Sequence, residues 1–336
     1  MARARRSRAR IMYQGMDISR FVMDFSYTDN YDKTDDISLT LADRDKRWVN
    51  EWFPETGETI EAEIQLFDWN RAGDNRSLPL GTFEIDNIGF SETVSINAVA
   101  APITSSARSE KKNRTWKKIS LSRIAADIAR TAVLSFVHKT DVDPFYDAAD
   151  QNDKSDLEFL EELCKSDGLC LKVTARQLII FEEALFEAEP SRIVIREGVS
   201  PIIDFPSFKR DAKDVYKACE VSHFDPKTDM TYIAVFDPVF VGNVGHTLKI
   251  REQFNSESDD INLDRKAKAR LREKNKNEWT CNMRMVGDII YFTGINVDII
   301  GWHKFDGKYH IVTCTHSIGS GGYTVSLSLR RCLEGY

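Results

Sequence analysis

The side chains best suited to chemistry gather near the C-terminal end of the sequence. His310, Cys314 and His316 alternate along a stretch whose pattern predicts a strand from Tyr309 to His316. Because side chains at alternate strand positions point the same way, we expect these three to share one face. A zinc ion takes such ligands, but it needs further donors with matching geometry. We interpret the three residues as a packed strand face and predict neither a metal site nor a cofactor.

A second set of residues, Asp298, His303 and Asp306, could in principle exchange protons. Gly301 and Gly307 stand among them and indicate a turn rather than a catalytic centre. The sequence also contains no GxSxG, no HExxH and no phosphate-binding loop. We therefore predict no catalytic residue and expect the chain not to be an enzyme.

Basic residues cluster in three segments, Arg3–Arg10, Lys111–Lys118 and Arg265–Lys276, which could contact phosphates. The whole chain carries a net charge of −7, and Trp116 is the one aromatic residue among these segments that could stack on a base. We predict solvated or partner-facing surfaces, and no specific nucleic-acid partner.

The composition is that of an ordinary globular protein, with 42% hydrophobic and 29% charged residues in 336. No apolar run approaches the roughly 20 residues that span a bilayer, so we expect no membrane association. The six cysteines form no CxxC pair and are expected to be reduced thiols made in a cytoplasm.

Alternating strands, separated by polar turns, dominate both ends of the sequence, and two helical patterns lie between them. Leu121, Ile124 and Ile128 recur at helical spacing, as do Leu157, Leu160 and Leu163. We predict a mainly β protein with an α+β insertion. The expected parts are a flexible basic arm at 1–9, a first β-barrel at 10–105, an α+β domain with two helices at 106–190, and a second β-barrel at 191–336 with an inserted polar and helical segment near 240–277.

A faint internal repeat supports two copies of one small barrel. Gly81-Thr-Phe-Glu-Ile-Asp is followed by Thr93-Val-Ser-Ile-Asn, and Gly307-Lys-Tyr-His-Ile-Val is followed by Thr324-Val-Ser-Leu-Ser. A strand and a glycine precede each pair in the same order, with Gly57 in the first copy and Gly294 in the second. Chance similarity between alternating strands is the competing explanation.

In the order of its motifs, the chain resembles the late-control, gene-D-like baseplate hub proteins of contractile tails, which occur in phages, defective prophages and tail-like bacteriocins. The motifs that carry the resemblance are Ile119–Ala129, Asp156–Leu169, Ala267–Asn275, Phe305–Val312 with His316, and Gly322–Arg331. The resemblance implies two barrels similar to the tail-tube subunit. It further implies a homotrimeric ring that adapts a six-fold tube to a three-fold spike.

The partners that this resemblance implies are the tail tube protein, a separate central spike protein, a LysM-bearing baseplate protein and the wedge proteins, with the tape measure protein as a further candidate. The chain would be made in the bacterial cytoplasm and end in the baseplate of the released particle. The alternative function is a tail-associated enzyme that processes peptidoglycan, or a module that binds the cell wall. The candidate tube-docking turns are formed by Ser91, Glu92, Thr93, Ser317, Gly319, Gly322 and Tyr323.

Overall fold

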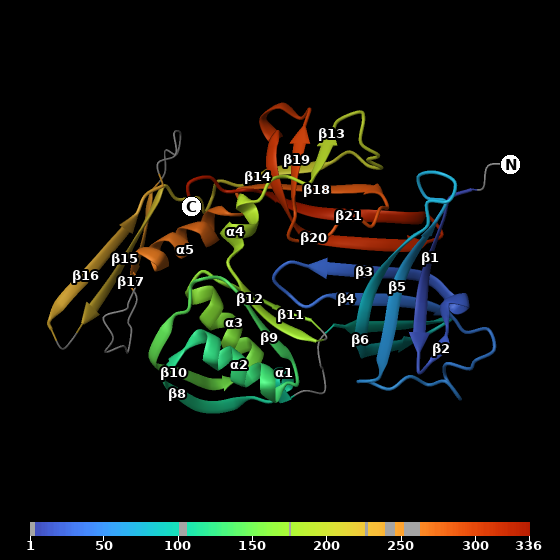
Figure 1. Ribbon diagram of the computed structural model, residues 1–336, viewed down its shortest axis with the longest axis horizontal. Coiled ribbons are helices and arrows are strands. Elements are labelled where there is room, and N and C mark those ends of the chain that lie inside the picture. The colour runs from blue at the N-terminus through green and yellow to red at the C-terminus, as the bar shows by residue number, and fades with distance from the viewer. Residues whose placement is uncertain (1–3, 101–105, 175, 226–227, 239–245, 252–262) are drawn as a thin grey trace.

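The computed structural model describes residues 4–100, 106–174, 176–225, 228–238, 246–251 and 263–336 (Figure 1). These residues form mostly β-strands with a few short helices, which confirms the predicted mainly β fold class. Strands of the N-terminal part are β1 (Arg6–Tyr13), β2 (Met16–Asp17), β3 (Val22–Asn30), β4 (Asp36–Ala42), β5 (Thr59–Phe67), β6 (Arg76–Phe90) and β7 (Thr93–Val99). Strands that complete the same sheet are β13 (Ile193–Arg196), β14 (Ser207–Arg210), β18 (Trp279–Val286), β19 (Asn296–Ile300), β20 (Gly307–Gly319) and β21 (Gly322–Arg331). Two 3-10 turns accompany them, η1 (Ser19–Phe21) and η2 (His303–Phe305).

The two ends of the chain meet in a single 13-stranded sheet with the path β14-β18-β21-β20-β3-β4-β7-β6-β5-β1-β2. The junction is the antiparallel pairing of β20 with β3, and both lie across the middle of Figure 1. One continuous hydrophobic core serves both parts, from Ile11, Leu39 and Ile85 in the first to Met283 and Leu327 in the second. The two halves are therefore fused through hydrogen bonds and a shared core, rather than being separate bodies.

The same strand order occurs twice in this sheet. The first half runs β3-β4-β7-β6-β5-β1, and the second runs β14-β18-β21-β20-β19-β13. The two copies differ at their last pair, because β1 is antiparallel to β5 whereas β13 is parallel to β19. The sequence motifs that predicted a repeat therefore lie in strands that occupy matching places.

Individual residues match as well as strands. Ile85 and Ile311 are each followed by a one-residue irregularity, and the carbonyl of each accepts a hydrogen bond from a glycine N–H, at 2.8 Å from Gly57 and 3.1 Å from Gly294. Both glycines have positive φ, 88° and 81°, which a residue with a side chain rarely adopts. The strand registers give further matches, namely Ile60 with Val297, Gly81 with Gly307, Phe83 with Tyr309, and Thr93–Asn97 with Thr324–Ser328.

The middle of the chain forms its own α+β unit with its own core. Its helices are α1 (Ser106–Ser109), α2 (Leu121–Thr131), α3 (Asp156–Ser166) and α4 (Glu183–Ala188), and its strands are β8 (Lys112–Ser120), β9 (Ser135–Lys139), β10 (Phe145–Lys154), β11 (Cys170–Val173) and β12 (Gln177–Phe181). The predicted apolar faces of both main helices are buried in this core, among them Leu121, Ile124 and Leu160. Ser155 and Glu158 form a reciprocal cap at the start of α3, which fixes where that helix begins.

A third, smaller unit projects from the body at the left of Figure 1. It consists of the sheet β16-β15-β17 and helix α5, with bounds β15 (Ala218–Asp225), β16 (Met230–Phe236), β17 (Thr247–Arg251) and α5 (Leu263–Asn275). Cys219, Val221, Ala267 and Leu271 form its buried core. The separate sheet already begins at β15, so the insertion starts earlier than the predicted 240–277. Residues 239–245 and 252–262 of that range lie outside the described residues.

The predicted flexible arm at 1–9 needs correction. Residues 1–3 of the predicted arm lie outside the described part, but β1 begins at Arg6 and pairs with β5 from Arg6 opposite Phe67 to Ala9 opposite Ile64. Ala9 is buried in the core. Residues 6–9 therefore form an ordered strand, because β5 pairs with one edge and the core covers one face. The basic segment 111–118 lies mostly in strand β8, which pairs with β10.

Candidate functional site

The His and Cys residues of β20 do not share one face. The strand shifts register at Val312, between Ile311 and Thr313, so the alternation reverses at that point. Cys314 and His316 point into the core between the halves, where His316 Nδ1 lies 2.7 Å from the Tyr323 hydroxyl. His310 lies on the other side, with Nδ1 2.8 Å from Asn296 Oδ1. The prediction of a common face was wrong because a bulge cannot be read from alternation.

These buried groups have the properties of packed core residues. Burial lowers the pKa of His310 and of His316 to about 4, so both rings are neutral at pH 7. Burial also raises the pKa of the Cys314 thiol, which keeps it protonated. Within the described residues, no three His, Cys, Asp or Glu side chains lie close enough to hold a metal ion.

The carboxylates of Asp298 and Asp306, which might exchange protons, accept hydrogen bonds from nearby residues. The Ser191 hydroxyl donates to Asp298 at 2.7 Å, and the Trp302 backbone N–H donates to Asp306 at 2.6 Å. His303 is exposed on η2. Asp306 thus closes the turn that the neighbouring glycines predicted.

The basic segments contact acidic groups within the chain. Lys112 and Arg114 on β8 bind Asp156, which is buried at the start of α3. Arg265 and Lys266 on α5 bind Asp167, which follows α3. The ion pairs of β8 therefore stabilise the α+β unit internally, whereas those of α5 attach the projecting unit to the α+β unit.

A buried ion cluster, which sequence reasoning missed, anchors α5 and α4 to the main sheet. Arg330 on β21 pairs with Glu183 at 2.6 Å and with Glu187, and Arg272 on α5 also pairs with both glutamates. Although burial opposes ionisation, Arg330 and neighbouring cations lower the pKa of Glu183 to about 2. Its members come from positions 183 to 330, and no local pattern signals such a contact.

Short polar side chains cover the side of the main sheet that lies opposite the core. Eight strands, β14-β18-β21-β20-β3-β4-β7-β6, run side by side, and one side of this run carries the core. The opposite side presents short polar residues, and we call it the polar face. Its members are Ser26, Thr28, Ser38, Thr40, Asn87, Ser95, Asn97, Ser207, Asn282, Thr313, Thr315, Ser317, Thr324, Ser326 and Ser328.

Charge on the polar face is sparse and of both signs. Its partly or fully exposed charges include Asp24, Asp36 and Glu84 on the acidic side, and Lys209 and Arg284 on the basic side. A hollow of about 300 Å³ lies over Ser26, Ser38 and Ser317 on this side. Solvent-facing strand positions are usually polar and often charged. The run of serine and threonine at every second position is therefore the sequence signal from which this surface could be predicted.

The candidate docking turns occupy matching places, because one joins β6 to β7 and the other joins β20 to β21. Ser91 and Glu92 are exposed, and in the second turn Ser320 to Gly322 are exposed. Tyr323 is buried against Trp69 and His316, so its side chain is not part of the exposed turn surface. Ser317 and Gly319 lie within β20, with Gly319 packed close to Asp24.

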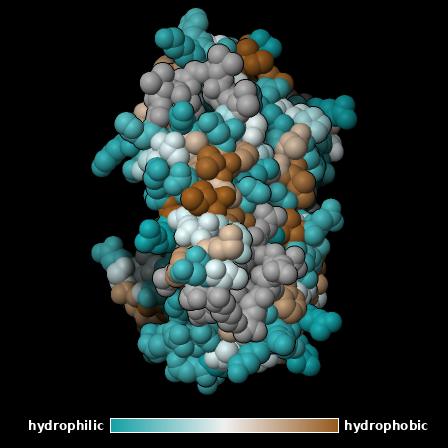
Figure 2. Space-filling view, turned by 90° about the vertical axis from the view of Figure 1, so that its left-hand side faces the viewer, coloured by the Kyte–Doolittle hydropathy of each residue, from teal (hydrophilic) through white to brown (hydrophobic). Residues whose placement is uncertain are grey.

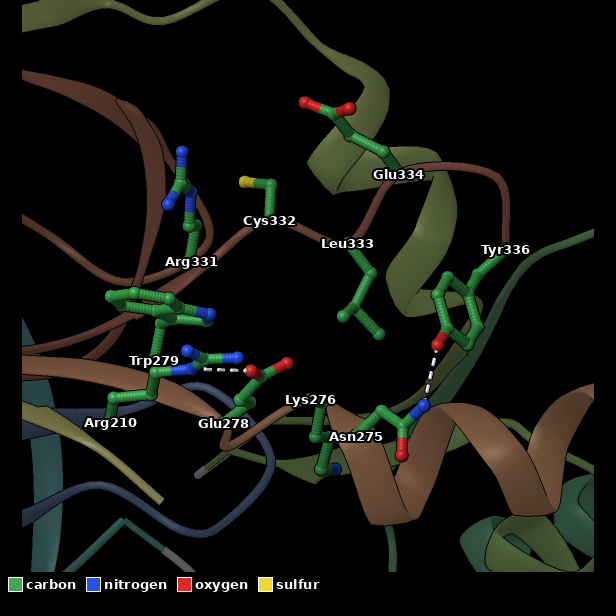
Figure 3. Close-up of a pocket in the computed structure, with 10 residues that line it drawn as sticks. All are labelled: Arg210, Asn275, Lys276, Glu278, Trp279, Arg331, Cys332, Leu333, Glu334 and Tyr336. Atoms are coloured by element: carbon green, nitrogen blue, oxygen red, sulfur yellow. Dashed lines mark hydrogen bonds and ion pairs between the residues drawn. The ribbon is translucent and has the colours of Figure 1, made fainter. Parts of the chain in front are cut away.

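A pocket of about 280 Å³ lies beside β14 (Figure 3). Arg210 on β14 stacks on Trp279, with its guanidinium 4.8 Å from the ring centroid, and donates to Glu278 at 2.8 Å. Asn275 donates to the Tyr336 hydroxyl at 2.6 Å on the opposite wall. Glu334 is directed away from Glu278 in Figure 3, so the pocket does not present the facing carboxylates of a glycosidase.

Exposed apolar side chains gather on β16 in the projecting unit. Met230, Tyr232, Ile233 and Val235 are each more than two-fifths exposed. Figure 2, which faces the side of the molecule on which this unit lies, shows hydrophobic patches among hydrophilic surface. No helix in the described part of the chain is long and apolar enough to cross a membrane.

Comparison with known proteins gives matches in structure alone. No family model matches the sequence, and no curated protein matches it. A tail protein from Neisseria meningitidis MC58 aligns with a TM-score of 0.69 at 13% identity, covering 97% of each chain. The 43 kDa tail protein of prophage MuSo2 from Shewanella oneidensis aligns with a TM-score of 0.68 at 13% identity, covering 97% of this chain and 98% of that one.

A component of the E. coli type VI secretion system, described as similar to the T4 bacteriophage tail proteins gp27 and gp5, aligns with a TM-score of 0.56. It is 11% identical, and the alignment covers 97% of this chain and 78% of that one. At these identities the likeness concerns the fold. The chain therefore has the fold of phage tail proteins, which confirms the expected resemblance at that level.

Proposed function

We propose that this chain is the structural baseplate hub of a contractile, phage-like tail. Three copies would close into a ring that receives the six-fold tail tube on one side and the three-fold central spike on the other. The observation that carries this proposal is the duplicated strand order within one chain. A molecule with two matching halves turns three copies into six nearly equivalent units, which is what a junction between six-fold and three-fold partners requires.

The junction between β20 and β3 supports this geometry. It places the second copy beside the first by antiparallel pairing over Thr313–Ile318 and Phe25–Asn30. Such a junction orders the two copies side by side in one sheet, as neighbouring units of a ring would be. The likeness to a protein described as similar to gp27 and gp5 points the same way.

The polar face is suited to the wall of the central channel. Its side chains are short and hydroxyl-rich, and its few accessible charges are of both signs in a chain of net charge −7. A wall of this kind would hold neither a polyanion by salt bridges nor an apolar segment by burial. Material that passes through the ring would therefore meet little resistance.

The remaining partners follow from the same proposal. The exposed turns at Ser91–Glu92 and Ser320–Gly322 would contact the tube, and the spike, LysM-bearing and wedge proteins would bind elsewhere on the ring. The chain would assemble in the bacterial cytoplasm and remain in the released baseplate. No observation favours the alternative of a wall-processing enzyme.

Copurification with the tube protein, followed by mass photometry, tests the hub directly. We expect a complex of three hub chains that nucleates tube growth. The same preparation should not clear purified peptidoglycan in a turbidity assay. A hub preparation that fails to associate with the tube protein but hydrolyses peptidoglycan would overturn the proposal in favour of the enzyme.

A further inference from the structure

The pairing of β20 with β3 joins the two copies within one chain. We use it as a template for the equivalent pairing of β6, whose partner strand would have to come from a second molecule. In the second copy, the distal half of β20 has β21 on one side and β3 on the other. In the first copy, the matching half of β6, from Asn87 to Phe90, has β7 on one side. Among the described strands, none pairs with its other side.

The complementary edge lies at the other end of the same run of strands. β14 occupies in the second copy the place that β3 occupies in the first, and β18 is its single partner among the described strands. Its residues Ser207, Lys209 and Arg210 are exposed. The eight-stranded run therefore ends in two unpaired edges that match the two partners of the internal junction. Unpaired edges of this kind are ready acceptors for another strand.

We propose that the ring closes by antiparallel pairing of β6 in one copy of this chain with β14 in the next copy. This inference rests on the proposed trimeric hub and specifies how its copies join. The matches between the halves fix the register, because Ser317 lies opposite Ser26 and His316 lies opposite Tyr27 in the template. Transferred to the ring, Ser91 faces Ser207 of the next copy, and Phe90 faces Phe208.

Side-chain chemistry fits this register on the core side. His316 and Tyr27 stack in the template, with ring centroids 6.0 Å apart and planes at 23°. The corresponding pair across the ring consists of two phenylalanines, and Phe90 is 37% exposed in the single chain. Cross-strand aromatic pairs stabilise sheets. Closure of the trimer would therefore cover the Phe90 side chain, which is partly exposed to solvent in the single chain.

Charge fits as well. The β14 edge carries Lys209 and Arg210, whereas the loop before β5, which leads toward the β6 edge, carries exposed Glu51 and Glu55. In the template, Thr293 donates from its N–H at 2.8 Å and its hydroxyl at 2.7 Å to Asp29. Thr56, which adjoins Glu55, is the residue of the first copy that matches Thr293. Arg210 on β14 is the residue that matches Asp29. An acidic loop would thus meet the arginine that borders the pocket of Figure 3.

Disulfide trapping tests the register in the full chain. We expect the double variant Ser91→Cys with Ser207→Cys to shift from monomer to covalent trimer on a non-reducing gel, because opposed strand positions meet disulfide geometry. The matched control Ser26→Cys with Ser317→Cys places the same substitutions at the internal junction and should stay monomeric on that gel. The displaced pair Ser91→Cys with Lys209→Cys should give far less covalent trimer.

Mass photometry of the same variants under reducing conditions separates this inference from the function on which it rests. A trimer by mass with no disulfide between copies at Ser91→Cys and Ser207→Cys, or with more at the displaced pair, would overturn the register while leaving the trimeric hub intact. Absence of any trimer, alone or with the tube protein, would overturn both. Hydrogen exchange provides a check without substitutions, because the amides of Asn87–Phe90 and Ser207–Arg210 should become protected on assembly.

Discussion

Tyr27 and His316 stack face to face where the two copies meet, with ring centroids 6.0 Å apart, although 289 positions separate them in the sequence. His316 also lies between the Tyr323 hydroxyl and the Tyr291 carbonyl, at 2.7 Å and 3.1 Å. A neutral histidine thus joins the two halves of the sheet in the shared core. Its protonation should affect the stability of the whole molecule.

Acid should destabilise the chain through His316. Burial lowers its pKa from 6.5 to about 4, so below pH 6.5 the unfolded chain binds a proton that the folded chain does not. The stability that this histidine contributes is therefore lost as pH falls from 6.5 to 4, by about 2 kcal/mol at pH 5. Denaturant titrations at pH 7 and pH 5 should show a smaller difference for His316→Gln than for wild type.

The control for that titration is His303→Asn, which alters an exposed histidine in a left-handed turn position that asparagine tolerates. It should leave the difference between pH 7 and pH 5 unchanged. Burial raises the pKa of Asp35 to about 6, which adds stability as pH falls through that range. Because this opposing contribution is common to all variants, only the difference between them is informative. Equal pH dependence in wild type and His316→Gln would refute a neutral buried ring.

Removing Arg330 should be far more damaging than removing a surface cation. Its side chain is 2% exposed and pairs with Glu183 and Glu187, so Arg330→Met leaves two buried carboxylates with Arg272 as their remaining ion-pair partner among the described residues. We expect a loss of about 3–5 kcal/mol in the free energy of unfolding. Lys165→Met breaks the exposed pair with Glu161 and should cost about 0–1 kcal/mol. Similar losses for both variants would mean that the buried cluster does not anchor α4 and α5.

Gly287 should tolerate no side chain. Its carbonyl accepts from the Trp69 indole at 3.0 Å, and a Cβ there would lie 2.4 Å from the Tyr323 ring. Gly287→Ala should therefore cost about 1–3 kcal/mol through overpacking. Gly321→Ala is the matched control, because a Cβ at that turn position meets nothing within 4 Å. Thermal melts of the two variants compare them directly, and a melt of Gly287→Ala that matches wild type would contradict the packing.

Truncation at the N-terminus should become costly between residues 5 and 9. Deletion of residues 1–5 leaves β1 intact, whereas deletion of 1–9 removes the pairing of Arg6–Ala9 with β5. The longer deletion exposes the edge beside Ile64 and Leu66 and should lose about 1–3 kcal/mol. Thermal melts of both truncations would measure this, and equal stability would restore the flexible-arm interpretation.

Bulky charged insertions at both docking turns should block tube assembly and spare the ring. The sites are Ser91–Glu92 and Ser320–Gly321, which lie outside the core, so the fold should tolerate them. Mass photometry should still give a trimer, and electron microscopy should show no tubes. Insertion of the same residues between Gln14 and Gly15, an exposed hairpin turn that joins β1 to β2, is the control. Normal tubes from the double-turn variant would mean that these turns face away from the tube.

Local patterns predicted the elements whose partners lie nearby. The apolar spacing in α2 and α3 marked two helices, and the recurring Gly-led and Thr-Val-Ser strands marked the repeat that the sheet order bears out. These signals survive because each strand or helix buries one face whatever the rest of the chain does. The same strands also indicate the polar face, because serine and threonine alternate with the core residues.

Features set by distant partners could not be predicted. The irregularity at Val312 arises where β20 passes from β19 to β3, and alternation gives no sign of it. Strand β8 has a polar sequence because little of it is buried, so only its pairing with β10 defines it. The ions around Arg330 come from three separate elements, and their charges resemble ordinary surface residues when read singly.

Cryo-electron microscopy of the particle that contains this chain tests the trimeric hub most directly. The hub predicts three copies in a single ring at the tip of the tube, with the two halves of each chain alternating around six positions. The polar face should line the channel, and β6 of each copy should adjoin β14 of the next. A ring of six copies, a single copy, or a location away from the tube axis would contradict it.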